Sequence, residues 1–525
     1  MVSPAAPDPR RWWTLAVLCL SLLMVVMGNT VLNVALPTLV RELHASSSQL
    51  QWIVDAYSLV FAGLLFTGGA LGDRFGRKGA LTAGLVTFGV GSGLAAVSNS
   101  ANQIIACRAV MGAAAALVMP ATLSILANTF APRERARAIG IWAGVAGIAG
   151  AVGPITSGWL LQHFWWGSVF FLNLPIVVVA VVTGRFLVPT SRDPRGIRLD
   201  LVGAALSIGA VSSLIYGIIE APARGWTDGV ILGSFAIAAA LMVVFASWEL
   251  SREHPMLDLR YFKRRGFTGG SIAISLVFFG MFGMFFLITQ YLQLVRGYSA
   301  LSAGVHMLPF AFTMMVVAPM SARIAERIGT RGTVCLGLAV AATGQFLLST
   351  NDIDTGYGLL ALSFVVLAAG MGLTMAPSTA SIMSSLPLAK AGIGSAMNDT
   401  NRELGGALGV AVLGSLVVSR YTSGIGGAIA GLPSALQEAA RRSLGGALQV
   451  AGQIGGDEGA ALARTAKHGF TDGMSYSLTI GSLVALAAAV LVAIVLPNRV
   501  AASEQQGSDG GDEVDARDTA PAAAG

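Results

Sequence analysis

The stretch Gly69-Ala-Leu-Gly-Asp73-Arg74-Phe-Gly76-Arg77-Lys78 lies between two long apolar runs of the sequence. A related stretch, Ala322-Arg-Ile-Ala-Glu326-Arg327-Ile-Gly329-Thr-Arg331, follows 253 residues later and also separates two apolar runs. The two stretches align without a gap, acid on acid, arginine on arginine and glycine on glycine. Paired motifs at corresponding positions indicate an internal repeat. We therefore expect two similar halves, each containing one copy of the motif.

The composition places both halves in a membrane. Of 525 residues, 54% are hydrophobic and 11% are charged, whereas soluble domains carry about a quarter charged residues. The 65 glycines suit close helix packing in a bilayer. We predict an all-α membrane protein.

Fourteen apolar runs are long enough to cross a bilayer, which takes about 20 residues. The runs of the first half and of an insertion are Trp13–Leu36, Leu50–Leu71, Ala80–Val97, Gln103–Leu126, Ala138–Leu161, Ser168–Leu187, Leu201–Ile219 and Val230–Trp248. Those of the second half are Phe267–Leu294, Ala303–Ile324, Thr333–Ser349, Tyr357–Met383, Gly394–Val418 and Met474–Leu496. We therefore expect halves at 13–187 and 267–497, with a two-helix insertion at 188–266.

Lysine and arginine gather in alternate short loops. The loops on the other side carry only Arg41, Arg224 and Arg296. Basic loops stay in the cytoplasm, so we expect both ends of the chain there, as an N-terminus at 1–12 and a disordered acidic tail at 498–525. Residues 421–470 are predicted to form a long external loop, with Pro433–Val450 an amphipathic helix on the outer surface.

Other partners and chemistries fit the sequence less well. The net charge of +6 arises from basic loops, so nucleic acid is not an expected partner. Cys19, Cys107 and Cys335 fall inside apolar runs without ligand-like spacing, so we expect packing residues and no metal site. We find no nucleotide-binding loop and no nucleophile with a base, so we do not expect an enzyme.

The first motif resembles the signature of the major facilitator superfamily. The fourteen spans resemble its drug:proton antiporter branch of the EmrB/QacA type. The resemblance extends to Asn29-Thr-Val-Leu-Asn33 in span 1, Gln51-Trp-Ile-Val-Asp55-Ala-Tyr57 in span 2, and Gly153-Pro154 with Gly158 in span 5. The chain departs from the family pattern at Gly28, where an aspartate linked to proton handling is usual, and at Met111, usually a glutamine.

Charged residues inside a bilayer usually mark a pathway or a pair. Asp55 and Arg108 lie at equal depth in spans 2 and 4, roughly 8 Å below the outer surface, so they can pair. Asp399, Arg402 and Glu403 are spaced i, i+3, i+4 and share one helical face. We assign these five residues to proton coupling. Static ion pairs that lock helices together are the alternative.

Two groups of residues are assigned to gating. The first group comes from the two motif copies and comprises Gly69, Asp73, Arg74, Gly76, Arg77, Glu326 and Arg327. By family resemblance, Asp73 and Arg74 form a charged latch that holds the two halves closed on the cytoplasmic side, and Gly76 permits a tight turn. Span 5 contains Gly153, Pro154 and Gly158. Glycine adds no side-chain bulk and proline interrupts the hydrogen bonding of a helix, which favours a hinge here. Ordinary turns and close helix packing are the alternatives for the two groups.

The substrate cavity is assigned to Asn29, Asn33, Met111, Phe282, Phe285 and Gln290. Aromatic and methionine side chains in span 9 suit flat apolar or cationic ligands. The resemblance implies a monomeric, proton-driven exporter of small lipophilic or cationic compounds from the bacterial cytoplasm, powered by the proton gradient and without a cofactor. The alternatives are an exporter of one metabolite, antibiotic or lipid, and a sensor that has lost transport.

Overall fold

The computed structural model describes residues 9–43, 47–191, 200–252, 255 and 257–498. Within these ranges the chain is helical, with no β-strand. The first half and the insertion contain α1 (Arg11–Leu43), α2 (Ser47–Phe75), α3 (Arg77–Ala96), α4 (Ala101–Thr129), α5 (Pro132–His163), α6 (Ser168–Phe171), α7 (Asn173–Leu187), α8 (Leu201–Arg224) and α9 (Gly229–Ser251). The second half contains η1 (Leu259–Lys263), α10 (Arg265–Gln290), η2 (Tyr291–Val295), α11 (Ala300–His306), α12 (Leu308–Ser349), α13 (Tyr357–Ser384), η3 (Leu388–Lys390), α14 (Ala391–Ile429), α15 (Ser434–Arg442), α16 (Leu444–Ile454) and α17 (Gly456–Val495).

Thirteen segments of the described chain are long and apolar enough to cross a membrane. One of them, Leu301–Ser349, has 49 residues, more than twice the length of one crossing. Gly329 interrupts it with a φ of 82°, a backbone angle that glycine adopts readily. The chain reverses there, so this segment contains two crossings and the count agrees with the predicted fourteen spans.

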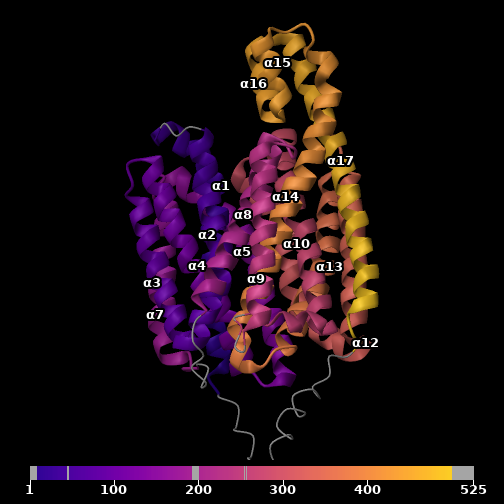
Figure 1. The fold of residues 1–525 in the computed structure, drawn as a ribbon. Helices are drawn as coiled ribbons and strands as arrows, with labels where there is room; N and C mark the ends of the chain where they lie inside the picture. Colours follow the sequence, from indigo (N-terminus) through magenta and orange to yellow (C-terminus); the bar gives the residue numbers. More distant parts are fainter. Residues whose placement is uncertain (1–8, 44–46, 192–199, 253–254, 256, 499–525) are drawn as a thin grey trace, which may run out of the picture.

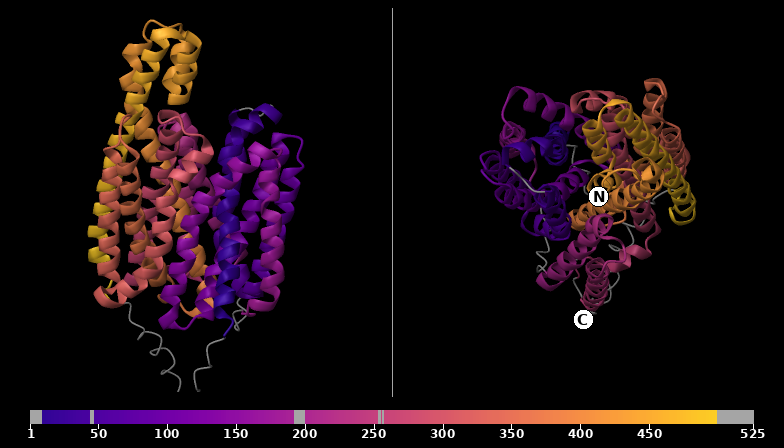
Figure 2. Two further views of the ribbon diagram at one scale, coloured as in Figure 1. Left: turned by 180° about the vertical axis from the view of Figure 1, so that it is seen from behind. Right: turned by 90° about the horizontal axis from the view of Figure 1, so that it is seen from above.

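The two halves stand side by side, and the start of α1 and the end of α17 lie at the same end of the bundle (Figure 1). We call this end the terminal face. Seen from above, the first and second halves occupy opposite sides of the molecule, as Figure 2 shows. Helices α2, α4 and α5 of the first half contact α11, α12, α13 and α14 of the second. The interface between halves therefore consists of these helices.

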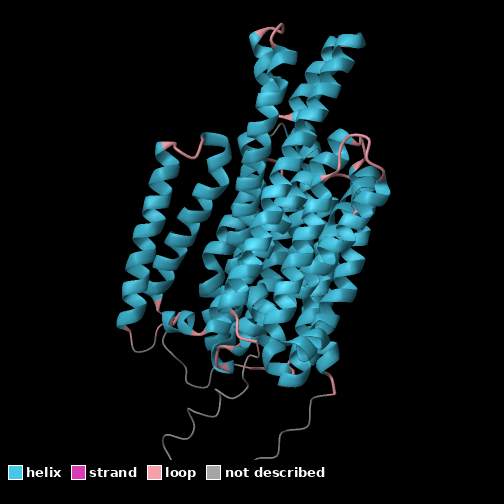
Figure 3. Ribbon diagram, turned by 90° about the vertical axis from the view of Figure 1, so that its right-hand side faces the viewer, coloured by secondary structure: helices cyan, strands magenta, loops and turns pink. Residues whose placement is uncertain are grey.

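The inserted pair α8–α9 stands at one side of the bundle (Figure 3). Helix α8 packs on both halves, because Val211 and Ile215 share an apolar cluster with Ala62 of α2 and Leu404 of α14. The indole of Trp226, in the turn after α8, donates a hydrogen bond to Ser415 of α14 (3.3 Å). The insertion thus bridges the two halves along one edge of their interface.

The segment 421–470, expected to be a long loop with one surface helix, lies beyond the bundle but is helical for most of its length. Helix α14 continues to Ile429 and α17 begins at Gly456, so both extend beyond the bundle (Figure 1). The expected helix Pro433–Val450 is two helices, α15 and α16, separated at Ser443. Polar residues such as Arg420 and Asp472 end the apolar runs, but a helix does not have to end where the bilayer does.

We call the outer parts of α14 and α17, together with α15 and α16, the helical projection. It has its own apolar core, in which Ile425, Ile429, Leu444 and Val450 are buried. The hydroxyl of Tyr421 donates to the carbonyls of Ala440 (2.9 Å) and Ser443 (3.2 Å), which joins α14 to the turn between α15 and α16. The projection lies on the face opposite the terminal face (Figure 1).

Candidate functional site

Asp73, near the end of α2 at the terminal face, binds the first turn of α14 in the other half. Its carboxylate accepts hydrogen bonds from the backbone N–H of Gly392 (2.9 and 3.1 Å) and of Ile393 (3.3 Å). The side chain of Asp73 is buried. The first N–H groups of a helix lack partners within it, and the helix dipole favours a negative charge at this end. Asp73 therefore holds the two halves together by capping α14.

Arg77, at the start of α3, completes this contact. Its guanidinium pairs with the same carboxylate (2.7 Å) and donates to the carbonyls of Leu388 (2.8 Å) and Ala389 (3.0 Å). Arg77 is 2% exposed, so these bonds replace its contacts with water. We call Asp73, Arg77 and the backbone of residues 388–393 the Asp73–Arg77 latch.

Glycines make this contact possible. A Cβ on Gly69 would lie 2.6 Å from the carbonyl oxygen of Gly392, so α2 and α14 cross with almost no space between them. Gly76 has a φ of 112°, which permits the turn from α2 to α3. Arg74, which was expected to form the latch with Asp73, is only half-buried, and its guanidinium carbon lies 5.1 Å from the ring centroid of its neighbour Phe75. The arginine that pairs with Asp73 in the structure is Arg77.

The second copy of the motif retains the turn but not the buried charges. Gly329 supplies the positive φ, and the backbone N–H of Thr330 donates to the carbonyl of Asn498 (2.9 Å). Glu326 and Arg327 are both exposed, whereas Asp73 and Arg77 are buried. The gating role of Glu326 and Arg327 stays a prediction.

Two to three turns into α14, Asp399 and Arg402 form a buried ion pair. The distance from Arg402 Nη1 to Asp399 Oδ1 is 3.3 Å, and the Asn398 amide donates to the same oxygen (3.4 Å). Asp399 is 1% exposed. Its other oxygen, Oδ2, has no hydrogen-bond partner among the described residues. The i, i+3 spacing thus brings the two charges together, as the helical geometry predicts.

Arg402 also contacts aromatic rings of both halves. Its guanidinium carbon lies 4.7 Å from the ring centroid of Phe278 on α10 and 5.5 Å from that of Trp142 on α5. Trp142 is 1% exposed, and its indole N–H has no acceptor in the part of the chain that is described. This places Arg402 at the interface between the halves.

On the side of the first half, Tyr57 and Arg108 continue this arrangement. Arg108 is fully buried, and its guanidinium carbon lies 4.2 Å from the ring centroid of Tyr57. It donates hydrogen bonds to the carbonyls of Gly28 on α1 (2.9 Å) and Ile53 on α2 (3.0 Å). Glu403 directly follows Arg402 on α14. We call Tyr57, Arg108, Trp142, Phe278, Asp399, Arg402 and Glu403 the central cluster.

Asp55 is half-buried on α2, two residues before Tyr57. Its expected pairing with Arg108 stays a prediction. At Gly28, where the family pattern has an aspartate, a Cβ would lie 2.7 Å from the ring of Phe88. The ring therefore occupies the space that a side chain at this position needs.

The residues assigned to the substrate cavity are dispersed. Met111 lies in the core of the first half against Gly91, and Phe285 packs edge-on against Phe310 with centroids 5.0 Å apart. Phe282 is 38% exposed, and the Gln290 amide donates to the carbonyl of Phe286 (3.3 Å). The side chains of Asn29 and Asn33 lie outside the described residues. The assignment of these six residues to a cavity stays a prediction.

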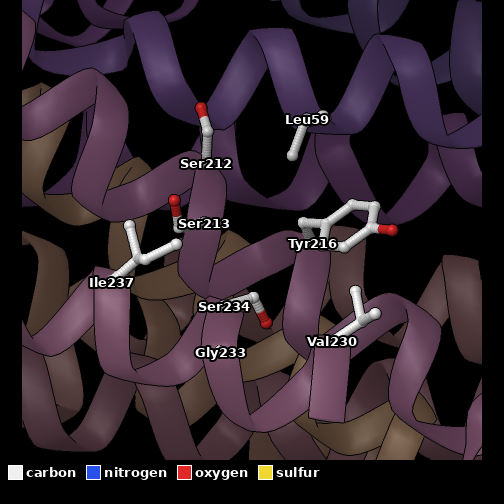
Figure 4. Close-up of a pocket in the computed structure, with 8 residues that line it drawn as sticks. All are labelled: Leu59, Ser212, Ser213, Tyr216, Val230, Gly233, Ser234 and Ile237. Atoms are coloured by element: carbon white, nitrogen blue, oxygen red, sulfur yellow. The ribbon is translucent and has the colours of Figure 1, made fainter. Parts of the chain in front are cut away.

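A groove of about 520 Å³ opens at the side of the bundle between α2, α8 and α9 (Figure 4). Leu59, Val230 and Ile237 line it together with Tyr216 and serines 212, 213 and 234. The groove lies beside the insertion, and none of its lining residues belongs to the central cluster.

Helix α5 is continuous over Pro132–His163, and several of its glycines pack against the other half. A Cβ on Gly140 would lie 2.6 Å from the carbonyl oxygen of Ala318, one on Gly147 2.9 Å from Met314, and one on Gly158 3.4 Å from Leu301. Gly153 is buried, and the side chain of Pro154 lies outside the described residues. Close packing accounts for Gly140 and Gly147, and the hinge at Gly153, Pro154 and Gly158 stays a prediction.

Sequence reasoning missed Trp142 and did not foresee how Tyr57 and Phe278 surround the charges. Trp142 sits among apolar residues and glycines of span 5. The sequence carries no signal that its ring meets an arginine located 260 residues later. That contact depends on how the halves are placed.

The comparisons with known proteins agree with this architecture. Residues 18–410 match the family model described as Major Facilitator Superfamily. The chain belongs to this superfamily and is a multi-pass membrane transporter.

Three relatives are similar to this chain over more than nine tenths of its length and of their own. The tetracenomycin C resistance and export protein of Streptomyces glaucescens is 35% identical over 92% of this chain and 91% of its own. The multidrug efflux pump LfrA of Mycolicibacterium smegmatis is 36% identical over 92% and 96%. The methyl viologen resistance protein SmvA of Salmonella typhimurium is 36% identical over 91% and 97%.

Solved structures show the same fold at low sequence identity. The proton:xylose symporter XylE superimposes with a TM-score of 0.61 at 14% identity, covering 94% of this chain and 97% of XylE. A bacterial homologue of the lysosomal transporter Spinster, in an inward-facing conformation, gives 0.55 at 17% identity over 94% and 98%.

Proposed function

We propose that this protein exports small lipophilic or cationic compounds across the bacterial inner membrane by proton antiport. The observation that carries the proposal is the central cluster, in which the Asp399–Arg402 ion pair lies at the interface between the halves and Glu403 follows Arg402 on the same helix. Buried ionisable groups inside a membrane protein usually mark a substrate or proton pathway. The relatives named as resistance and efflux proteins support the direction of transport.

Coupling follows from the charge of the cluster. When Asp399 or Glu403 takes up a proton, its attraction for Arg402 falls, and so does its attraction for a bound cation. Protons and substrate then compete for the same carboxylates, as antiport requires. Alternating access adds a conformational step, in which the Asp73–Arg77 latch opens and closes the terminal face. In this proposal the terminal face lies on the cytoplasmic side of the membrane.

A transport assay tests the proposal. Inverted membrane vesicles that contain the protein are energised, and a pH-sensitive dye reports proton movement when a cationic or neutral drug is added. We expect drug-triggered proton release with the wild type and none with Asp399→Asn. Comparison with Asp55→Asn and Glu403→Gln then shows which carboxyl groups carry the proton. Release that persists in all three variants would contradict coupling through these acids.

An exporter dedicated to one compound is the second candidate. It is favoured by the relative named for tetracenomycin C, a single antibiotic, at 35% identity. The same drug panel separates the two candidates, because a dedicated exporter responds to one chemical scaffold and a multidrug exporter to several.

A further inference from the structure

The guanidinium of Arg402 lies where an organic cation would be expected to bind. It contacts the rings of Phe278 (4.7 Å) and Trp142 (5.5 Å), which belong to different halves. A cation within about 6 Å of an aromatic ring face is attracted to it, most strongly to tryptophan and out of contact with water. Aromatic rings of both halves thus contact one positive charge, and that charge is the guanidinium of Arg402 rather than a ligand.

The ion pair that holds Arg402 is weak for a buried pair. It has a single contact of 3.3 Å, whereas strong charge-assisted bonds to carboxylates measure about 2.7–2.9 Å and are often twofold. Asp399 Oδ2 and the indole N–H of Trp142 have no hydrogen-bond partner among the described residues, although both side chains are 1% exposed. Buried polar atoms normally have partners, so this site has capacity for a further ligand.

The charges on this face of α14 leave room for one more positive charge. Asp399 and Glu403 are acids, and Arg402 is the one base among the three. Arg108, a buried cation of the first half, donates to the carbonyls of Gly28 and Ile53. Asp55 lies on the same helix as Tyr57, further towards the face with the helical projection.

We propose that Arg402 is a tethered competitor of cationic substrates. A substrate cation displaces its guanidinium from Trp142 and Phe278 and takes its place beside the carboxylates of Asp399 and Glu403. The competition sets charge selectivity, since a bound ligand has to supply the attraction that Arg402 gives up. The inference rests on the proposed function, because it concerns the same site.

Equilibrium binding to the full-length protein in lipid nanodiscs tests the role of Arg402. The probes are tetraphenylphosphonium with one positive charge, methyl viologen with two, and neutral triphenylphosphine oxide. We compare the wild type with Arg402→Gln and Arg402→Met. Arg420→Gln is the matched control, because Arg420 lies on the same helix with its guanidinium 4.3 Å from the ring of Tyr476, but outside the cluster.

Removal of the competing charge is expected to tighten binding of tetraphenylphosphonium at least about tenfold and that of methyl viologen by a larger factor. Binding of the neutral oxide should change less than about twofold, since it has no net charge to feel the loss. The control should match the wild type. If the glutamine variant does not fold, the methionine variant, which keeps a long side chain, gives the same readout. Unchanged or weaker binding of both cations in the folded variant would overturn the proposal.

Binding and transport can fail separately. Tighter cation binding by Arg402→Gln without any proton-coupled flux in wild-type vesicles would support the competitor role and contradict antiport. Drug-triggered proton release by the wild type together with unchanged cation binding by the variant would do the reverse.

Discussion

The carboxylate of Asp73 in the first half binds the backbone N–H of Gly392 in the second half, at 2.9 and 3.1 Å. The residues are 319 positions apart in the chain. This bond joins a side chain to the start of a helix, so its strength depends on the charge of Asp73 and on the position of α14. It can therefore form and break as the two halves move relative to each other.

Replacement of the latch carboxylate is expected to loosen the start of α14. Asp73→Asn retains the size of the side chain but removes the charge, and a hydrogen bond to a charged group contributes about 1.5–3 kcal/mol. Amide hydrogen exchange at Gly392 and Ile393 should accelerate by about one to two orders of magnitude. Asp228→Asn is the control, since Asp228 caps α9 through the N–H of Val230 (3.0 Å). Equal exchange rates in Asp73→Asn and wild type would contradict the capping role.

A larger side chain at the helix crossing is expected to keep the latch open. The Cβ of a leucine at position 69 would lie 2.6 Å from the carbonyl oxygen of Gly392. Gly69→Leu therefore requires α2 and α14 to separate. A cysteine introduced at position 393 should then react faster with a membrane-impermeant thiol reagent applied from the terminal face. Gly79→Leu serves as the control, because no atom lies within 4 Å of its Cβ position. The prediction fails if both variants give the same labelling rate.

Replacement of Arg108 by lysine is expected to destabilise the protein. The planar group of this arginine donates to two carbonyls on different helices and stacks on Tyr57, a geometry that a single ammonium group does not reproduce. Loss of one such bond in a buried site costs about 1.5–3 kcal/mol. We expect a fall of several degrees in the apparent unfolding temperature of the purified protein. Arg420→Lys, an exposed arginine that also lies over a ring, should leave it unchanged, and an equal fall in both variants would argue against this account.

The helical projection is expected to depend on one tyrosine hydroxyl. Tyr421→Phe removes the bonds to Ala440 and Ser443 and should destabilise the docking of α15 by about 1 kcal/mol. Hydrogen exchange in residues 434–442 should accelerate about fivefold, with the bundle unaffected. Tyr476→Phe, on a half-exposed ring of α17, is the matched control. No change in exchange would show that apolar packing alone holds the projection.

Local pattern was enough to predict the class of the fold. Apolar runs predicted the helices, because the length and hydropathy of a span are properties of neighbouring residues in a bilayer, and the repeated motif predicted the two halves and the insertion between them. The helical projection was missed for the same reason. Hydropathy reports where a chain leaves lipid, and α14 and α17 leave lipid without ending.

The sequence alone therefore predicted that Asp399 and Arg402 lie inside a span and share one helical face, and the structure brings the two together as an ion pair. The sequence treated the two motif copies alike, yet Asp73 is buried and Glu326 is exposed. Only the tertiary structure decided that difference, because burial of Asp73 needs the start of α14 beside it. The contact of Arg402 with Trp142 likewise arises because α5 packs against the second half of the protein. The spacing of residues within one helix does not specify where another helix lies.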